Sequence, residues 1–340
     1  MQKANTYILA IESSCDDTSC AILCNTRVLS NVTANQKIHE QYGGVIPELA
    51  SRDHQKNIVP VVDAALKEAG INLDELSAIA VTCGPGLMGS LLVGLNFAKS
   101  LALSLNIPLI EVDHMQAHIM AHFIESPEQK IPEFPFICLT VSGGHTQLVL
   151  ISDILKFELI GETMDDAVGE AFDKAAKILG LPYPGGPLID KYALDGNPSR
   201  FKFANAKIPD YNFSFSGVKT SFLYFIQKEL EANPNFVKEN LNDICASYQH
   251  HLIQMLIKKA KSLVIDKGIK HIAIAGGVSA NSELRKQIAA LGDELKIHTY
   301  IPLFVYCTDN AAMIGSVGYY KYQKKEFASL SISPITQHSL

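Results

Sequence analysis

The feature that most constrains the fold is a strand–turn–strand pattern that occurs twice in the chain. Residues 7–25 form an apolar stretch, a polar turn and a second apolar stretch, and residues 136–153 repeat this pattern around a Ser-Gly-Gly-His turn. Short apolar runs bounded by glycine, serine and aspartate are hairpin signals. A β-hairpin at the start of each half predicts a duplicated α/β domain with a cleft between the two copies.

Helical and strand patterns alternate through the rest of the chain, which favours an α/β class with mainly buried sheets. We expect strands over 78–82 and 271–275 and helices that begin near Asn281 and Asp309. Further helices are predicted over 46–70, 87–105, 166–179, 218–230 and 241–266. The segment 124–136 contains three prolines and mixed charge, which predicts a domain boundary. We therefore expect an N-terminal lobe over 1–125, completed by a C-terminal helix over about 309–340, and a C-terminal lobe over 136–308.

Composition describes an ordinary globular chain of about two domains. Of the 340 residues, 47% are hydrophobic and 19% are charged, and we find no apolar run long enough for a membrane span and no secretory leader. The net charge of −6 argues against broad non-specific binding to nucleic acid. Lysines at 258–270 form a candidate basic patch, although a solvated helix face explains them as well. The seven scattered cysteines, without CxxC spacing, indicate reduced thiols and a cytoplasmic location.

His114 and His118 stand four residues apart, a spacing that places both rings on one side of a helix. Asp309, which we expect at the end of an apolar strand, would complete a two-histidine, one-carboxylate set suited to iron or zinc. A zinc protease of the HExxH type needs glutamate directly after the first histidine, and Met115 occupies that position. The pair therefore predicts a metal that holds a phosphate or an oxygen-bearing intermediate. Two alternatives stay open, namely histidines that only decorate a partly buried helix and an Asp309 that caps a helix.

Four glycine-containing loops follow predicted strands, at 84–86, 142–145, 185–186 and 276–279. Glycine lets backbone N–H groups approach a phosphate, and a following helix adds its positive N-terminal end. The loops predict nucleotide binding, with ordinary turns as the alternative. Neither the P-loop pattern nor the G-x-G-x-x-G fingerprint is present. Asp173 lies shortly before the third loop, where its carboxylate could hold a ribose hydroxyl or an ammonium group.

These motifs, taken together and in order, resemble the TsaD family of tRNA threonylcarbamoyltransferases over essentially the whole chain. The family was once labelled a sialoglycoprotein endopeptidase because of its histidine pair. The matching stretches are IESSCDDT at 11–18, GGVIPELASRDH at 43–54, GPGL at 84–87, VSGGHTQ at 141–147, GEAFDK at 169–174, YPGGP at 183–187, FSFSG at 213–217 and GGVSAN at 276–281.

The resemblance implies a duplicated actin-like ATPase (ASKHA) fold, with two lobes around a nucleotide cleft. It implies that threonylcarbamoyl-AMP donates its threonylcarbamoyl group to N6 of the adenosine 3′ of the anticodon, in tRNAs that read codons beginning with A. It implies one divalent metal per chain, with Fe²⁺ expected ahead of Zn²⁺, held by His114, His118 and Asp309. The implied donor contacts are Thr140, Val141, Ser142, Gly143, Gly144, Asp173, Gly186, Asp190 and Asn281. Asp190 is carried over less firmly, because family members vary at that position.

The resemblance also implies partners and a mechanism. Bacterial family members act with TsaB, a paralogue, and TsaE, an ATPase, and the apolar helices 47–69 and 88–105 are candidate partner faces. Whether ATP or ADP shares the donor's cleft stays open. The exocyclic amine of adenosine is a weak nucleophile, so the enzyme must position it and stabilise the developing oxyanion and the departing AMP. We expect the metal to act as template and electrophile and the loop amides of 142–144 to hold the phosphate side. Glu12 and Asp16 are the candidates for a general base.

Two rival functions remain from the sequence. A sugar or carboxylate kinase of the same superfamily would need a γ-phosphate acceptor pocket and an aspartate base, but not the histidine pair. A non-catalytic scaffold would be expected to have lost His114, His118 and Asp309 together.

Overall fold

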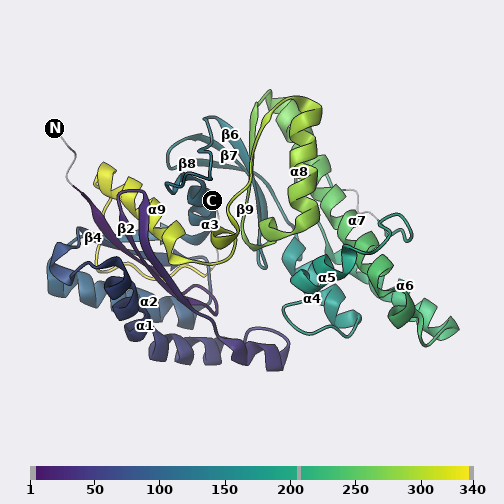
Figure 1. Ribbon diagram of the computed structural model, residues 1–340, viewed down its shortest axis with the longest axis horizontal. Coiled ribbons are helices and arrows are strands. Elements are labelled where there is room, and N and C mark those ends of the chain that lie inside the picture. Colours follow the sequence, from purple (N-terminus) through teal and green to yellow (C-terminus); the bar gives the residue numbers. More distant parts are fainter. Residues whose placement is uncertain (1–4, 205–207, 337–340) are drawn as a thin grey trace. The chain divides into compact units, whose positions relative to one another are not determined.

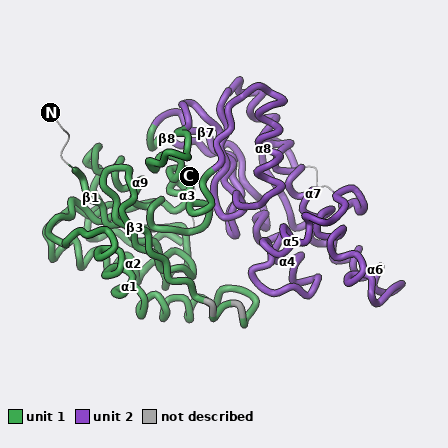
Figure 2. Tube along the Cα trace, in the orientation of Figure 1, with its two compact units in different colours: residues 1–131, 154–156, 302–340 green, residues 132–153, 157–301 purple. Residues whose placement is uncertain are grey.

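The computed structural model describes residues 5–204 and 208–336 and contains two compact units (Figure 1). Unit 1 comprises Met1–Ile131, Ile154–Lys156 and Pro302–Leu340, and unit 2 comprises Pro132–Asp153 and Phe157–Ile301. Figure 2 shows that the C-terminal segment belongs to the same unit as the N-terminal part of the chain.

Unit 1 is built on a five-stranded sheet with the order β3-β2-β1-β4-β5. Its strands are β1 (Tyr7–Glu12), β2 (Thr18–Cys24), β3 (Arg27–Ala34), β4 (Ala78–Gly84) and β5 (Leu109–Asp113). Strand β2 is antiparallel to both of its neighbours, β1 and β3, whereas β4 and β5 run parallel to β1.

Helices cover both faces of this sheet, which explains why β1 is apolar on both sides. The helices of unit 1 are α1 (Pro47–Ala69), α2 (Met88–Leu105), α3 (His114–Met120) and α9 (Ala311–Lys324), with short 3-10 helices η1 (Lys37–Tyr42), η2 (Leu73–Glu75), η3 (Ala121–Phe123) and η5 (Phe304–Tyr306). Leu9 and Ile11 belong to the same buried cluster as residues of α1 and α2. Ile8 points to the other face, where a Cβ on Gly318 of α9 would lie 3.2 Å from its side chain. The small residue lets α9 pack closely on the sheet.

Helix α2 corrects one expectation. Among the described residues it is the one helix long and apolar enough to cross a membrane by length and composition. We missed it because Asn96 and Lys99 interrupt the apolar run. Its buried residues Leu91, Leu95 and Ala98 belong to the core of unit 1, where the helix packs on β4.

Unit 2 repeats the strand order of unit 1, with a sheet that reads β10-β9-β6-β7-β8. Its strands are β6 (Phe136–Val141), β7 (Thr146–Asp153), β8 (Lys156–Glu162), β9 (His271–Ala275) and β10 (His298–Tyr300). Strand β6 is antiparallel to β7 and parallel to β9, as β1 is to β2 and β4. The shared order and directions confirm the predicted duplicated α/β architecture.

The helices of unit 2 enclose a core rich in aromatic side chains. They are α4 (Val168–Ile178), α5 (Gly186–Ala193), α6 (Ser216–Ala232), α7 (Phe236–Lys267) and α8 (Ser282–Leu295), with the 3-10 helix η4 (Gly277–Ala280). Phe222 and Tyr248 are fully buried, with ring centroids 4.5 Å apart. The hydroxyl of Tyr248 donates to the carbonyl of Ala171, so α7 is tied to α4 through the core.

One predicted helix boundary and one predicted strand were wrong, each for an identifiable reason. Helix α7 starts at Phe236 rather than at residue 241, and Asn240 within it has non-helical backbone angles, so regular periodicity begins only after this kink. The apolar stretch before Asp309 is not a strand, because it contains the 3-10 helix η5. Tyrosine, valine and phenylalanine in that stretch gave a strand-like composition without strand structure.

Candidate metal centre and donor loops

Helix α3 places the two histidines. It begins directly after β5, and the carboxylate of Asp113 accepts a hydrogen bond from the backbone N–H of Gln116 (2.8 Å), which fixes the start of the helix. His114 therefore occupies the first turn and His118 the next. The ring centroids lie 4.7 Å apart at an interplanar angle of 85°, and the two residues are 7% and 1% exposed.

Asp309 reaches both rings from the segment before α9. Its Oδ1 atom lies 3.5 Å from Nε2 of His114 and 3.3 Å from Nε2 of His118. The helix-capping alternative does not apply to Asp309, because Asn310 is the residue that caps α9 by accepting from the backbone N–H of Met313 (3.0 Å). The structure thus brings together all three residues that the sequence suggested as ligands.

The donor set suits a divalent transition metal. One ligand atom from each of His114, His118 and Asp309 lies within 4.8 Å of the others. Neither ring nitrogen of His118 makes a hydrogen bond, although the side chain is buried. A buried imidazole without such a partner is costly unless another group uses its nitrogen lone pair. Because the Asp309 side chain is 29% exposed, the cluster keeps one open side, as a catalytic metal requires.

Glu12 lies behind His114, at the end of β1. Its Oε2 atom is 3.1 Å from Nδ1 of His114 and accepts a hydrogen bond from the hydroxyl of Thr82 at 2.6 Å. Burial alone would lower the pKa of His114, but the charges of Asp309 and Glu12 raise it to about 9. Burial raises the pKa of Glu12, and the interaction with His114 outweighs this and lowers it. The sequence pattern gave no sign of Thr82, since it reads as an ordinary strand residue.

The turn after β1 brings two further carboxylates toward the centre. Asp16 and Asp17 are both half-buried, and Asp17 accepts a hydrogen bond from Asn35 (2.8 Å). Burial, followed by the charges of Asp16 and Asp309, raises the pKa of Asp17 to about 7. We did not single out Asp17 from the sequence, yet its carboxyl is the one whose pKa this turn raises.

In unit 2 the predicted donor contacts begin at the end of β6. Thr140 and Val141 are buried within the strand, whereas Gly143 and Gly144 are exposed. A Cβ added at either glycine would meet nothing within 4 Å. The N–H of Ser142 donates to the carbonyl of His145 (2.8 Å) and so closes the turn internally. We had expected the amides of all three residues 142–144 to face the donor. The Ser142 amide is already hydrogen-bonded within the turn, so this expectation narrows to the amides of Gly143 and Gly144.

Asp173 faces the loop that leads into α5. Its Oδ1 atom accepts from the backbone N–H of Gly185 (2.8 Å) and of Gly186 (3.2 Å). Burial raises the pKa of this carboxyl, and the two amide hydrogen bonds oppose the rise. Asp173 thus holds the loop that contains Gly186, a role that the sequence did not predict.

Asp190 and Asn281 are joined through Gln249 on α7. The amide nitrogen of Gln249 donates to Asp190 Oδ1 (3.0 Å), and its Oε1 atom accepts from the Asn281 side chain (2.7 Å). The side-chain Oδ1 atom of Asn281 caps α8 by accepting from the backbone N–H of Leu284 (3.0 Å), and Asp190 Oδ2 accepts from the backbone N–H of Ser282 (3.0 Å). Gln249 was missed in the sequence because an isolated glutamine within a helix carries no pattern.

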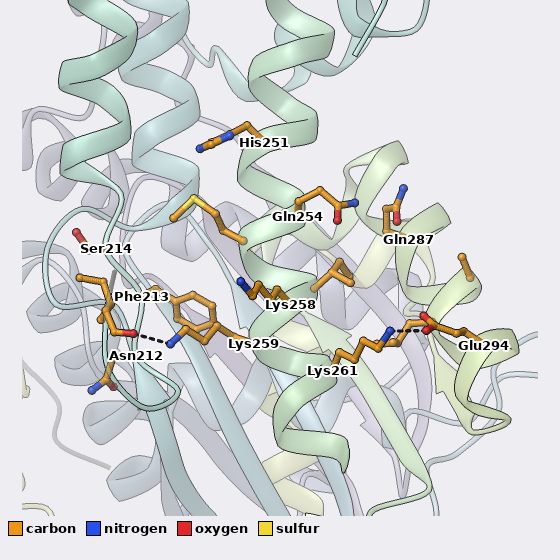
Figure 3. A pocket seen from close by; sticks show the side chains of 15 residues that line it. Asn212, Phe213, Ser214, His251, Gln254, Lys258, Lys259, Lys261, Gln287 and Glu294 are labelled. Atoms are coloured by element: carbon orange, nitrogen blue, oxygen red, sulfur yellow. Dashed lines mark hydrogen bonds and ion pairs between the residues drawn. The ribbon is translucent and has the colours of Figure 1, made fainter. Parts of the chain in front are cut away.

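The candidate basic patch lies at a cavity of about 800 Å³ between α7, α8 and residues 208–214 (Figure 3). Lys258, Lys259 and Lys261 line it together, as Figure 3 shows. The ammonium group of Lys259 donates to the carbonyl of Ile208 (2.9 Å), and Lys261 pairs with Glu294. Two of these three charges are thus used within the chain, which favours the structural interpretation of the patch.

Comparison with known proteins identifies the relatives of this chain. The family described as tRNA N6-adenosine threonylcarbamoyltransferase (TsaD) matches residues 27–316. A protein of that name from Christiangramia forsetii is 61% identical over 332 residues, covering 98% of this chain and 97% of the relative. Another from Cytophaga hutchinsonii is 56% identical over 333 residues, covering 98% of this chain and 96% of the relative.

A solved structure supports the fold independently. Full-length HypF in the phosphate- and nucleotide-bound form matches with a TM-score of 0.61 at 12% identity, over 94% of this chain and 46% of that chain. At this identity the likeness concerns the fold alone, and it confirms the actin-like fold.

Proposed function

Because the chain belongs to the TsaD family of tRNA N6-adenosine threonylcarbamoyltransferases, we propose that it forms threonylcarbamoyladenosine in tRNA with a metal bound by His114, His118 and Asp309. The donor is threonylcarbamoyl-AMP, and the acceptor is N6 of the adenosine 3′ of the anticodon in tRNAs that read codons beginning with A. The observation that carries the metal-assisted form of this proposal is the convergence of the three ligand atoms within 4.8 Å.

The chemistry explains what the site must supply. The lone pair of the exocyclic amine is delocalised into the adenine ring, so the amine attacks a carbamoyl carbon only when it is well positioned and the developing oxyanion is stabilised. The new bond joins N6 to the carbamoyl carbon, the bond from that carbon to the phosphate oxygen breaks, and AMP leaves. A bound divalent metal would supply Lewis acidity for this oxygen and a template for the reacting groups. The partly exposed side of Asp309 leaves room for such an oxygen. Asp16 remains our candidate to accept the proton from N6.

The donor's anionic side is assigned to the exposed glycines of the first loop in unit 2. Gly143 and Gly144 present backbone without side chains, which suits close approach by a phosphate. The loop at Gly186, held by Asp173, and the pair Asp190 and Asn281, held by Gln249, would contact the nucleoside part. Since both polar atoms of the Asn281 side chain are already hydrogen-bonded, we assign its contact to the backbone.

We propose Fe²⁺ ahead of Zn²⁺ as the resident metal. Two histidines and one carboxylate with an open side form the ligand pattern of non-haem Fe(II) sites. Zinc sites with three protein ligands use the same donor atoms, so metal analysis of the purified protein decides between the two.

Partners are proposed from the family and from one surface of unit 1. A groove between α1 and α2 is lined by apolar and small polar side chains, including Ile58 and Leu92. Val59 and Met88, on the same two helices, are 61% and 47% exposed. An apolar surface of this kind suits a protein partner, and we assign it to a TsaB-type paralogue.

We further propose a TsaE-type ATPase as the second partner, ATP or ADP as an added ligand, and the cytoplasm as the place of action.

The experiment that tests this function is a transfer assay with defined components. Purified protein, its TsaB-type and TsaE-type partners and unmodified tRNA are incubated with threonylcarbamoyl-AMP, and the nucleoside is quantified by mass spectrometry. We expect product from the wild type and none from the His114→Ala/His118→Ala variant. Product from both would remove the metal from the mechanism. No product from either, with active partners, would return attention to the kinase alternative, which the relatives do not favour.

A further inference from the structure

The two ring nitrogens of His114 face different partners. Nε2 faces Asp309 Oδ1 at 3.5 Å, on the side of the metal centre, whereas Nδ1 lies 3.1 Å from Glu12 Oε2 and 3.2 Å from the Ser14 hydroxyl, which can accept from Nδ1 as well. A carboxylate can only accept a hydrogen bond, so Nδ1 must carry the proton. In the neutral imidazole the Nε2 lone pair is then free for a metal, which is the tautomer that ligation requires.

Glu12 is itself fixed from two directions. The hydroxyl of Thr82, on the neighbouring strand β4, donates to Oε2 at 2.6 Å, and the backbone N–H of Ser14 donates to Oε1 at 2.5 Å. Glu12 and Thr82 are both 0% exposed. A buried carboxylate is costly unless it is paired and hydrogen-bonded, and here both oxygens have partners. The sheet thus presents a rigid acceptor to the back of His114.

The other histidine has no such support. Nδ1 of His118 is buried and makes no hydrogen bond, so its ring is not fixed through that nitrogen. The ring of His114 is therefore fixed by a hydrogen bond at Nδ1, whereas the ring of His118 is not. Because His114 is the anchored ligand, disturbing its support should weaken the whole set.

We propose that Glu12 is a positioning residue of the metal centre, which fixes the tautomer and the orientation of His114, and that Thr82 holds Glu12 in place. This inference rests on the proposed metal centre and replaces the earlier assignment of Glu12 as a candidate general base. Glu12 acts through His114, with its carboxylate on the side of the ring away from the ligand atoms.

The test measures metal affinity without tRNA or donor. Metal-free wild type and Glu12→Gln are titrated with Co²⁺ against a chelator, and the visible absorption of bound Co²⁺ is recorded. In Glu12→Gln the amide NH₂ must face either the Ser14 N–H or the Nδ1–H of His114, and either arrangement disturbs the anchor. We expect Co²⁺ to bind about 10- to 100-fold more weakly, with an altered spectrum.

Two further variants test the same inference if Glu12→Gln folds poorly. Thr82→Val keeps the shape of the side chain and removes the hydroxyl, which donates to Glu12 (2.6 Å) and, over a longer distance, to the carbonyl of Ile11 (3.4 Å). We expect a smaller loss of Co²⁺ affinity in the same direction. Ser13→Ala is the matched control, because its buried hydroxyl donates to the carbonyl of Ser90 (3.0 Å) rather than to the centre. Its Co²⁺ affinity should equal that of the wild type.

Two outcomes would overturn the inference. The first is equal Co²⁺ affinity in the wild type and Glu12→Gln, and if Glu12→Gln has then lost transfer, Glu12 acts on the reaction itself. The second is an equal loss in Ser13→Ala, which would indicate general disturbance of the strand end. A wild type that binds Co²⁺ but transfers nothing would refute the proposed function alone, so the two failures are distinguishable.

Discussion

Nε2 of His118 lies 3.3 Å from Oδ1 of Asp309, although the two residues belong to segments at opposite ends of unit 1's sequence. The contact depends on α9, whose Ser316 hydroxyl donates to the carbonyl of Met120 at the end of α3 (2.8 Å). The metal centre therefore forms only when the C-terminal helix has packed against α3. A metal that binds there should stabilise this packing.

Asp309→Asn tests that coupling. The substitution keeps the size of the side chain and removes the charge that makes it a good metal ligand. In the wild type, free metal at about 100 times its Kd should stabilise the fold by about 2.7 kcal/mol, and Tm should rise accordingly. We expect little or no rise for Asp309→Asn in the same thermal scan. An equal rise in both proteins would show that Asp309 is not a ligand.

The pH dependence of metal binding follows from His114. Its pKa is raised from 6.5 to about 9, so the metal-free protein holds a proton there at neutral pH. The metal must displace that proton, and affinity should therefore rise between pH 6.5 and pH 9. Asp17, with its pKa raised to about 7, loses a proton in the same window and adds negative charge near Asp309. Chelator competition at both ends of this window measures the effect, and a flat profile would contradict it.

The free energy of unfolding of the metal-free protein should fall over the pH range in which metal affinity rises. A raised pKa in the folded state means that the proton on His114 stabilises the fold fully below pH 6.5, and that this stabilisation is lost as pH rises through about 9. Asp17 acts in the same direction, because a raised acid pKa costs stability once the carboxyl ionises. Urea unfolding of the metal-free wild type at pH 6.5 and at pH 9 should show a lower free energy of unfolding at the higher pH. His114→Gln should show a smaller decrease.

Gly144→Ala tests the assignment of the donor's anionic side. A methyl group has open space at this position, so the free energy of unfolding should change by less than about 0.5 kcal/mol. We expect donor binding to weaken about tenfold or more, since the methyl group would occupy the space of the phosphate. Gly217→Ala, at another exposed glycine of unit 2 with open space, is the control. Equal donor binding by Gly144→Ala and the wild type would refute the assignment.

Asp173→Ala tests the hold on the Gly186 loop. Removing the carboxylate leaves the N–H groups of Gly185 and Gly186 without their acceptor, so we expect destabilisation of about 1–3 kcal/mol in urea unfolding. Asp195→Ala, an exposed aspartate of the same unit, should change stability by less than about 0.5 kcal/mol. Similar values for the two variants would show that Asp173 does not support the loop.

Much of the fold was predictable where periodicity is strong. The expected strand 271–275 is β9 (His271–Ala275), and the expected helix 87–105 is α2 (Met88–Leu105) within one residue. The third strand of the first sheet, β3 (Arg27–Ala34), was missed because it is largely half-buried and its polar residues hide the alternation. The same holds for β8 (Lys156–Glu162). Pairing with a neighbouring strand defines such strands, and sequence periodicity does not report pairing.

The site was predictable where residue type and spacing coincide. The spacing of His114 and His118 determines their common helix face, and the structure adds Asp309 as expected. Thr82 and Gln249 could not be predicted, because each matters through hydrogen bonds to side chains that are distant in the sequence. The occupied amide of Ser142 was likewise invisible, since only the closed turn shows that His145 accepts from it.

The measurement that tests the central claim most directly is single-turnover transfer by the wild type and by Asp309→Asn, each with partners, tRNA, threonylcarbamoyl-AMP and one equivalent of Fe²⁺. Threonylcarbamoyladenosine in the tRNA is quantified by mass spectrometry, and bound metal is measured in the same samples. We predict product and one bound metal per chain in the wild type, and loss of both in the variant. Undiminished product from an Asp309→Asn protein without metal would contradict the account.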